Sequence, residues 1–136
     1  MYSHILTPMA ADYETRGPAA LAVAEALLDE GGRVTLLHVQ ETIPSYVESY
    51  IPKEVIKKTG DEIRRGLETL AKDKAYRVDV AVVTGKAPTM IVDYAERHGA
   101  DCIVIASHRP GVADYILGST AAWVARHADS AVHILR

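Results

Sequence analysis

Two short turns in the C-terminal third of the chain carry groups that could bind an anion. The first follows an apolar run and reads Ser107-His108-Arg109-Pro110-Gly111. The second opens a helical pattern and reads Gly118-Ser119-Thr120. A helix N-terminus offers N–H groups without intrahelical partners, and an arginine offers a planar donor fork that suits phosphate. These residue types predict a phosphate site formed by the two turns.

Simpler chemistry has to be weighed against this hypothesis. An ordinary helix cap would explain Ser119, although not why a second donor-rich turn precedes it. Ser107 and His108 do not indicate a catalytic pair, because adjacent side chains on an extended segment point to opposite faces. The chain has neither a Gly-x-x-x-x-Gly-Lys-Ser/Thr loop nor a Gly-x-Gly-x-x-Gly fingerprint. Typical P-loop and dinucleotide sites are therefore poorly supported.

Two other loops could contribute to such a site. The segment Thr7-Pro8-Met9-Ala10-Ala11-Asp12 follows the first apolar run, and its small residues would let a ligand approach the backbone. Asp12 could accept a hydrogen bond from a ribose hydroxyl, or it could be a plain turn or capping residue. Lys86 could neutralise a phosphate, or it could be an exposed lysine without a special role.

The elements that would position these loops can be read from hydrophobic patterns. Short runs rich in β-branched residues occur at 3–6, 34–39, 78–83, 102–106 and 131–135. Several are nearly continuous, which is typical of parallel strands covered on both faces. Helical patterns separate them, so the sequence predicts a doubly wound α/β domain with helices on both faces of a parallel sheet. Ligands bind such sheets beyond the carboxyl ends of the strands, where the strand order reverses.

Four helices are expected between the strands, beginning near Pro18, Pro52, Pro88 and Gly118. Gly31-Gly32 would end the first near Glu30, and Gly99 would end the third. Residues 40–51 form the one long irregular stretch and could be a mobile flap.

The amino-acid composition excludes several classes of protein. The 136 residues suffice for one domain, 1–136, and 49% hydrophobic with 24% charged residues indicate a globular chain. A net charge of −3 argues against a nucleic-acid binder. The lone Cys102 is expected to be a buried apolar residue, and His38 and His133 to be core or interface residues. No signal peptide and no apolar run of roughly 20 residues is found, so we expect a cytoplasmic protein without membrane insertion.

The chain resembles the universal stress protein family over essentially its whole length. The resemblance rests on the order and spacing of the segments Ile5-Leu6-Thr7-Pro8, Leu37-His38-Val39, Gly85-Lys86-Ala87-Pro88, Ala100-Asp101-Cys102-Ile103-Val104-Ile105-Ala106-Ser107-His108 and Leu117-Gly118-Ser119-Thr120. It implies a Rossmann-like, five-stranded parallel sheet of order 3-2-1-4-5, and commonly a homodimer through the last strand, here Ala131–Leu135.

The resemblance also implies an adenine-nucleotide site. Thr7, Pro8 and Val39 would border the adenine and ribose. The phosphates would lie among Ser107, His108, Arg109, Gly118, Ser119 and Thr120, with Gly111 turning the loop between them. The implied cofactor is ATP or another adenine nucleotide, which Mg²⁺ could accompany. The implied function is regulation of an unidentified protein partner, with little or no hydrolysis, because no water-activating base is identified; we therefore do not expect an enzyme.

The phosphate loop departs from the family pattern of Gly, two residues, Gly, nine residues and Gly-Ser/Thr. Ala106 and Arg109 stand at the first two glycine positions, and the loop is one residue shorter. Ala10 replaces an acidic residue that family binders usually have. These departures keep an alternative open, in which the same fold is a dimeric interaction module that binds no nucleotide.

Overall fold

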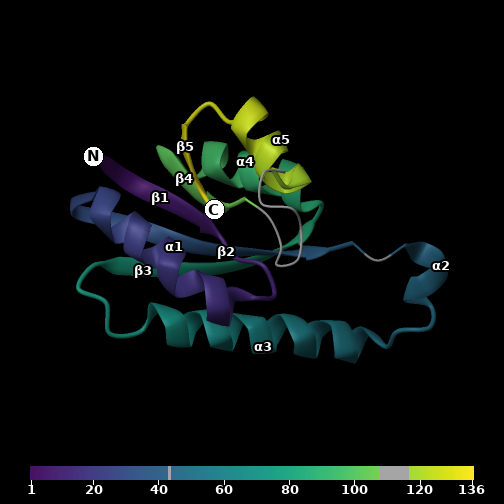
Figure 1. The fold of residues 1–136 in the computed structure, drawn as a ribbon. Coiled ribbons are helices and arrows are strands. Elements are labelled where there is room, and N and C mark those ends of the chain that lie inside the picture. The colour runs from purple at the N-terminus through teal and green to yellow at the C-terminus, as the bar shows by residue number, and fades with distance from the viewer. Residues whose placement is uncertain (43, 108–116) are drawn as a thin grey trace.

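A parallel sheet forms the centre of the molecule (Figure 1). The computed structural model describes residues 1–42, 44–107 and 117–136. Along the chain the elements are β1 (Tyr2–Pro8), α1 (Tyr13–Leu27), β2 (Leu28–Glu41), α2 (Ser45–Glu48), α3 (Lys53–Ala71), β3 (Arg77–Gly85), α4 (Ala87–Arg97), β4 (Cys102–Ala106), α5 (Ser119–His127) and β5 (Ala131–Leu135). All strand pairs are parallel and the order is β3-β2-β1-β4-β5. The predicted fold class and strand order are confirmed.

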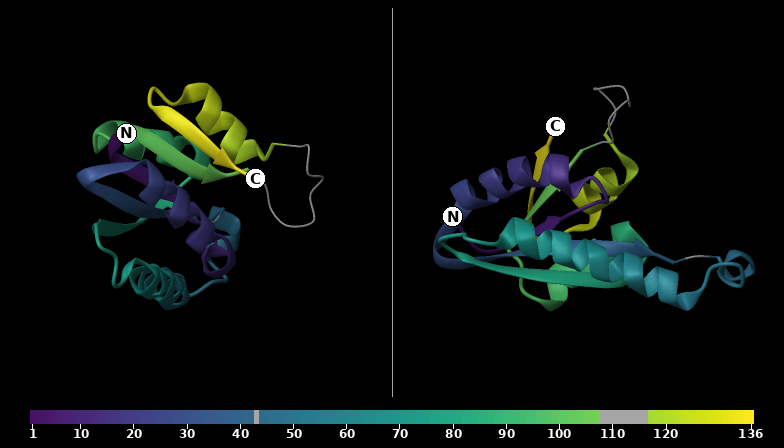
Figure 2. Two further views of the ribbon diagram at one scale, coloured as in Figure 1. Left: turned by 60° about the vertical axis from the view of Figure 1, so that its left-hand side comes forward. Right: turned by 90° about the horizontal axis from the view of Figure 1, so that it is seen from below.

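Helices cover both faces of the sheet (Figure 2). α1 and α3 lie on one face, and α4 and α5 lie on the other. Each face has its own aliphatic core, and β1 contributes to both, with Ile5 in the first and Leu6 in the second. This two-sided burial explains the nearly continuous apolar runs of the sequence. Among the described residues, no helix is long and apolar enough to cross a membrane.

Several predicted elements are confirmed. β4 and β5 have the predicted bounds, and α3, α4 and α5 begin within one residue of Pro52, Pro88 and Gly118. α4 gives way to Gly99 at a φ of 69°, a left-handed conformation that glycine adopts without strain. Cys102 is buried, and burial raises the pKa of its thiol to about 11. It is therefore a small apolar core residue, as the sequence indicated.

The first helix was predicted wrongly at both ends. It begins at Tyr13 because Asp12 is its N-cap, where the Asp12 carbonyl accepts the N–H groups of Thr15 and Arg16. Pro18 therefore lies inside α1 rather than in its first turn. The helix ends at Leu27 instead of near Glu30.

Gly31 and Gly32 belong to β2 and do not end a helix. The β1–β2 register shifts here, because Tyr2 pairs with Leu28 whereas His4 pairs with Arg33. Gly31 has a φ of 79°, and a Cβ on Gly32 would lie 2.9 Å from the Ser3 carbonyl oxygen. The two glycines thus let the chain turn from α1 into a closely paired strand.

The segment 40–51 is more regular than predicted. β2 continues to Glu41, and the short helix α2 stands beyond its end, away from the body of the fold (Figure 1). The Gln40 side-chain amide donates a hydrogen bond to the Ile56 carbonyl at 3.0 Å, which fixes the end of β2 to the first turns of α3. Tyr46 and Tyr50 are exposed.

A buried histidine holds the amino end of β1. His4 is only 5% exposed, its Nδ1 lies 3.1 Å from the His98 carbonyl oxygen, and its Nε2 lies 2.8 Å from Thr35 Oγ1. A carbonyl can only accept, so Nδ1 carries the proton and Nε2 accepts from the threonine hydroxyl. Burial and the nearby Arg33 lower the pKa of His4, although the His98 carbonyl, Asp101 and Asp79 oppose the shift.

This histidine is expected to make the fold less stable in mild acid. Because the folded pKa is lowered, the unfolded chain binds the proton more readily as the pH falls through about 6.5. The stability contributed by neutral His4 is therefore present at neutral pH and is lost at lower pH, with a slope of at most about 1.4 kcal/mol per pH unit. Urea unfolding between pH 7.5 and 5 should show a smaller pH dependence for His4→Gln than for the natural chain. Equal slopes for the natural chain and His4→Gln would contradict the role given to His4.

Candidate functional site

The carboxyl ends of β1 and β4 lie side by side at the point where the strand order reverses. Ile5 pairs with Cys102, and Leu6 pairs with Ile103, so both strands leave the sheet at the same edge. β1 is followed by a connection to α1 on one face, whereas the chain after β4 leads to α5 on the other. This is the switch point at which ligands of doubly wound sheets bind.

Ser107 ties three elements together at this edge. It follows β4 directly and is buried. Its N–H donates to the Leu135 carbonyl of β5 at 2.8 Å, and its own carbonyl accepts the N–H of Gly118 at 2.5 Å. The start of α5 is thereby fixed against the ends of β4 and β5.

The N-terminus of α5 is the strongest candidate for an anion site. Gly118 is the N-cap residue, Ser119 and Thr120 are the first two helical residues, and no side chain of the described residues caps the helix. The interpretation of Ser119 as an ordinary cap is therefore wrong. The partial positive charge of the helix end and the two nearby hydroxyl groups fit an anion.

The N-terminus of α4 differs in this respect. The Glu41 carboxylate of β2 accepts the N–H of Ala87 at 3.1 Å, so this helix end already holds an anionic group. Lys86 is its N-cap residue and is exposed. No local pattern indicates the role of Glu41, because it lies 46 positions from Ala87.

Near the end of β1, Thr7 has a hydroxyl group that finds no partner among the residues that the structure describes. Its side chain is fully buried, and Oγ1 forms no hydrogen bond with any described residue. A buried hydroxyl without a partner is costly, so its presence next to a candidate ligand site is informative. Pro8 follows it and is half-buried, while Val39 is buried in the core beside α4.

The loop after β1 is held in place by β2. The Met9 N–H donates to the Leu37 carbonyl at 2.8 Å, and the His38 ring donates from Nδ1 to the Met9 carbonyl, also at 2.8 Å. His38 is thus a buried, hydrogen-bonded histidine, as predicted. Its role in fixing this loop was not apparent from the sequence, because the contact spans 29 positions.

Asp12 has a structural role that does not depend on a ligand. Besides starting α1, it places a carboxylate oxygen 4.0 Å from the Arg16 guanidinium. Its contact with a ribose stays a prediction. The predicted residues His108, Arg109 and Gly111 lie outside the described residues. Within the described ranges, no group of three His, Cys, Asp or Glu side chains could hold a metal ion.

The structure therefore gathers most of the predicted site residues at one edge of the sheet. Thr7 and Pro8 end β1, and Val39 lies near the end of the neighbouring β2. Ser107 follows β4, and the residues Gly118, Ser119 and Thr120 start α5. These residues are far apart in the sequence, and the parallel sheet brings the strands that carry them together.

Comparisons with known proteins agree with this architecture. The whole chain, residues 1–136, matches the Universal stress protein family. Universal stress protein G of Shigella flexneri is 28% identical over 142 residues, which cover 100% of both chains.

Solved structures show the same arrangement. The hypothetical protein MJ0577 superposes with a TM-score of 0.84 at 26% identity, covering 99% of this chain and 96% of its own. A universal stress protein family protein from Arabidopsis thaliana, solved with AMP bound, has a TM-score of 0.68 at 18% identity, covering 98% and 90%. With a match along its entire length, this chain belongs to the Universal stress protein family.

Proposed function

We propose that this protein binds ATP or another adenine nucleotide at the carboxyl edge of its sheet and uses the nucleotide to regulate a protein partner. The observation that carries the proposal is the N-terminus of α5. No side chain of the described residues caps it, and the Gly118–Ser107 hydrogen bond holds it at the switch point. An anionic group there would meet backbone donors and the positive end of the helix.

The described residues fit a nucleotide on both sides of this position. Ser119 and Thr120 would contact phosphate oxygens, and Ser107 would support the turn. On the other side, Thr7 Oγ1 supplies a buried polar atom without a described partner, next to Pro8. The AMP bound by the Arabidopsis relative supports an adenine nucleotide as the ligand class. Regulation rather than turnover, and a cytoplasmic location, stay predictions.

The same proposal includes a homodimer formed through β5. This strand pairs with β4 on one side only, and its apolar residues Val132, Ile134 and Leu135 are half-buried. The opposite edge strand, β3, is less suited to pairing. Arg64 donates to the Val80 carbonyl at 3.4 Å, and β3 carries charged side chains, both of which discourage edge-to-edge contacts.

Nucleotide binding can be tested directly. The purified protein is denatured, any released nucleotide is identified by chromatography, and the emptied, refolded protein is titrated with ATP by calorimetry. We expect a retained adenine nucleotide or saturable binding. The absence of both a retained nucleotide and binding at millimolar ATP would overturn the proposal. That result would favour the alternative, a dimeric interaction module that binds no nucleotide. A partner captured equally with and without ATP would support that alternative.

A further inference from the structure

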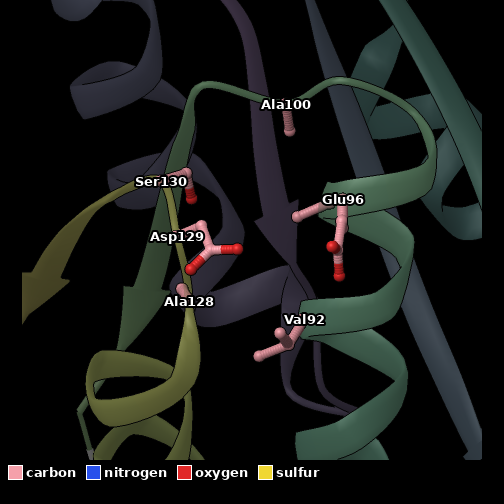
Figure 3. Close-up of a pocket in the computed structure, with 7 residues that line it drawn as sticks. Val92, Glu96, Ala100, Ala128, Asp129 and Ser130 are labelled. Carbon is pink, nitrogen blue, oxygen red and sulfur yellow. The ribbon is translucent and has the colours of Figure 1, made fainter.

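A small pocket lies far from the candidate nucleotide site, between α4 and the turn that joins α5 to β5 (Figure 3). It is near the amino ends of β4 and β5, whereas the nucleotide site is at the carboxyl ends. Val92, Ala100 and Ala128 form its apolar part. The carboxylates of Glu96 and Asp129 face each other across it.

The polar groups of this pocket have no hydrogen-bond or ion-pair partners among the described parts of the chain. Ser130 Oγ is buried and forms no hydrogen bond with any described residue. Glu96 and Asp129 form no ion pair with the residues that the structure describes. Two carboxylates and a hydroxyl above an aliphatic surface match the chemistry of a guanidinium, which donates several hydrogen bonds in a plane and packs on apolar groups.

The open edge of β5 indicates where such a group could come from. Two copies related by a twofold axis perpendicular to the sheet pair their identical edge strands antiparallel. β5 runs from Ala131 to Leu135, so its middle residue is His133. If the axis passes His133, Leu135 lies opposite Ala131 of the partner subunit. One position further along, Ser130 lies opposite Arg136 of the partner subunit.

The two opposed residues also share a face of the sheet. Val132 and Ile134 pack into the core beneath α4 and α5. Side chains alternate along a strand, so positions 130 and 136 are on this same face when the extended backbone continues. Arg136 is exposed. Directly opposed residues of an antiparallel pair point to the same side, which is the side of the pocket.

We propose that this pocket is a guanidinium site completed by Arg136 of the partner subunit. The twofold axis forms the contact twice per dimer, between the acidic pocket of each copy and the arginine of the other. The contact fixes the register of the β5–β5 pairing, because a shift of the strands would carry the arginine away from the two carboxylates. This inference rests on the proposed homodimer and is independent of nucleotide binding.

Sedimentation equilibrium of the natural chain, Arg136→Ala, Asp129→Asn and the double variant tests the proposal. Each single substitution is expected to raise the dimer dissociation constant about tenfold or more. Arg136→Ala leaves two carboxylates without their partner, and Asp129→Asn leaves the arginine with one carboxylate instead of two. The double variant should lose less than the product of the single effects, since both changes remove the same interaction. Arg136→Lys should dimerise with intermediate affinity, because it keeps the charge and loses the planar fork.

Arg65→Ala and Glu68→Gln are matched controls on the exposed surface of α3 and should leave the dissociation constant unchanged. Circular dichroism verifies that each variant is folded. A natural chain that stays monomeric at all concentrations would overturn both the homodimer and the guanidinium site. A dimer that is insensitive to Arg136→Ala and Asp129→Asn would overturn the guanidinium site alone.

Discussion

Replacing Ser119 by aspartate is expected to weaken ATP binding about 100-fold without unfolding the protein. The new carboxylate would stand in the first turn of α5, where the proposal places phosphate oxygens. Two like charges about 4 Å apart near a protein surface repel by about 4 kcal/mol. This repulsion is large enough to account for a 100-fold loss, which corresponds to about 2.7 kcal/mol.

The same substitution separates binding from folding. A carboxylate near a helix N-terminus usually stabilises the helix by about 0.3–1 kcal/mol, so Ser119→Asp should unfold at the same or a higher temperature. Thr89→Asp is a matched control, because Thr89 is exposed in the first turn of α4, away from the proposed phosphate position. ATP titration by calorimetry gives the affinities. Unchanged ATP affinity in Ser119→Asp, or an equal loss in Thr89→Asp, would contradict the placement of phosphate at α5.

Truncation of Leu67 is expected to give the largest loss of stability that we predict for a single site. α3 has 19 residues, and Leu67 is its one buried residue. Leu67 is fully enclosed in the core between α3, α1 and the sheet. Leu67→Ala should lower the free energy of unfolding by about 3 kcal/mol, because it removes buried methyl groups and leaves a cavity.

Urea unfolding followed by circular dichroism measures this effect. A loss of about 3 kcal/mol corresponds to a decrease in the melting temperature of roughly 10 °C for a chain of this size. Val55→Ala on the same helix is the control, because Val55 is 51% exposed and its truncation should change stability by at most about 0.5 kcal/mol. Similar losses for the two variants would show that α3 is not anchored through Leu67.

The strands and most helix starts could be predicted because their signals are local. β4 and β5 are short apolar runs with clear ends, and α4 and α5 start next to proline or glycine turns. α1 was misplaced because Pro18 is typical of a first helical turn, and this signal was followed instead of Asp12, a possible capping residue that the structure places at the N-cap. Likewise, Gly31 and Gly32 fit the end of a helix as well as an irregular strand pairing.

The candidate site was predictable in its residue types and in part of its arrangement. Turns after parallel strands meet at one edge, so Thr7, Ser107 and Ser119 could be grouped from the pattern of strands and helices. The contacts that distinguish the N-terminus of α4 from that of α5 could not be predicted from the sequence. Glu41 occupies the start of α4, while no side chain in the described part of the chain caps α5, and this difference depends on residues far apart in the sequence.

The sequence by itself determined the alternation of strands and helices, the aliphatic two-sided core, and the family to which the chain is similar, because periodicity and motif spacing are properties of neighbouring residues. Only the tertiary structure decided which polar groups find partners. It left two buried hydroxyl oxygens without hydrogen bonds among the described residues. Thr7 Oγ1 lies near the carboxyl ends of the strands, and Ser130 Oγ lies near their amino ends. Partners of buried groups are set by packing between distant segments, and that packing exists only when the chain is folded.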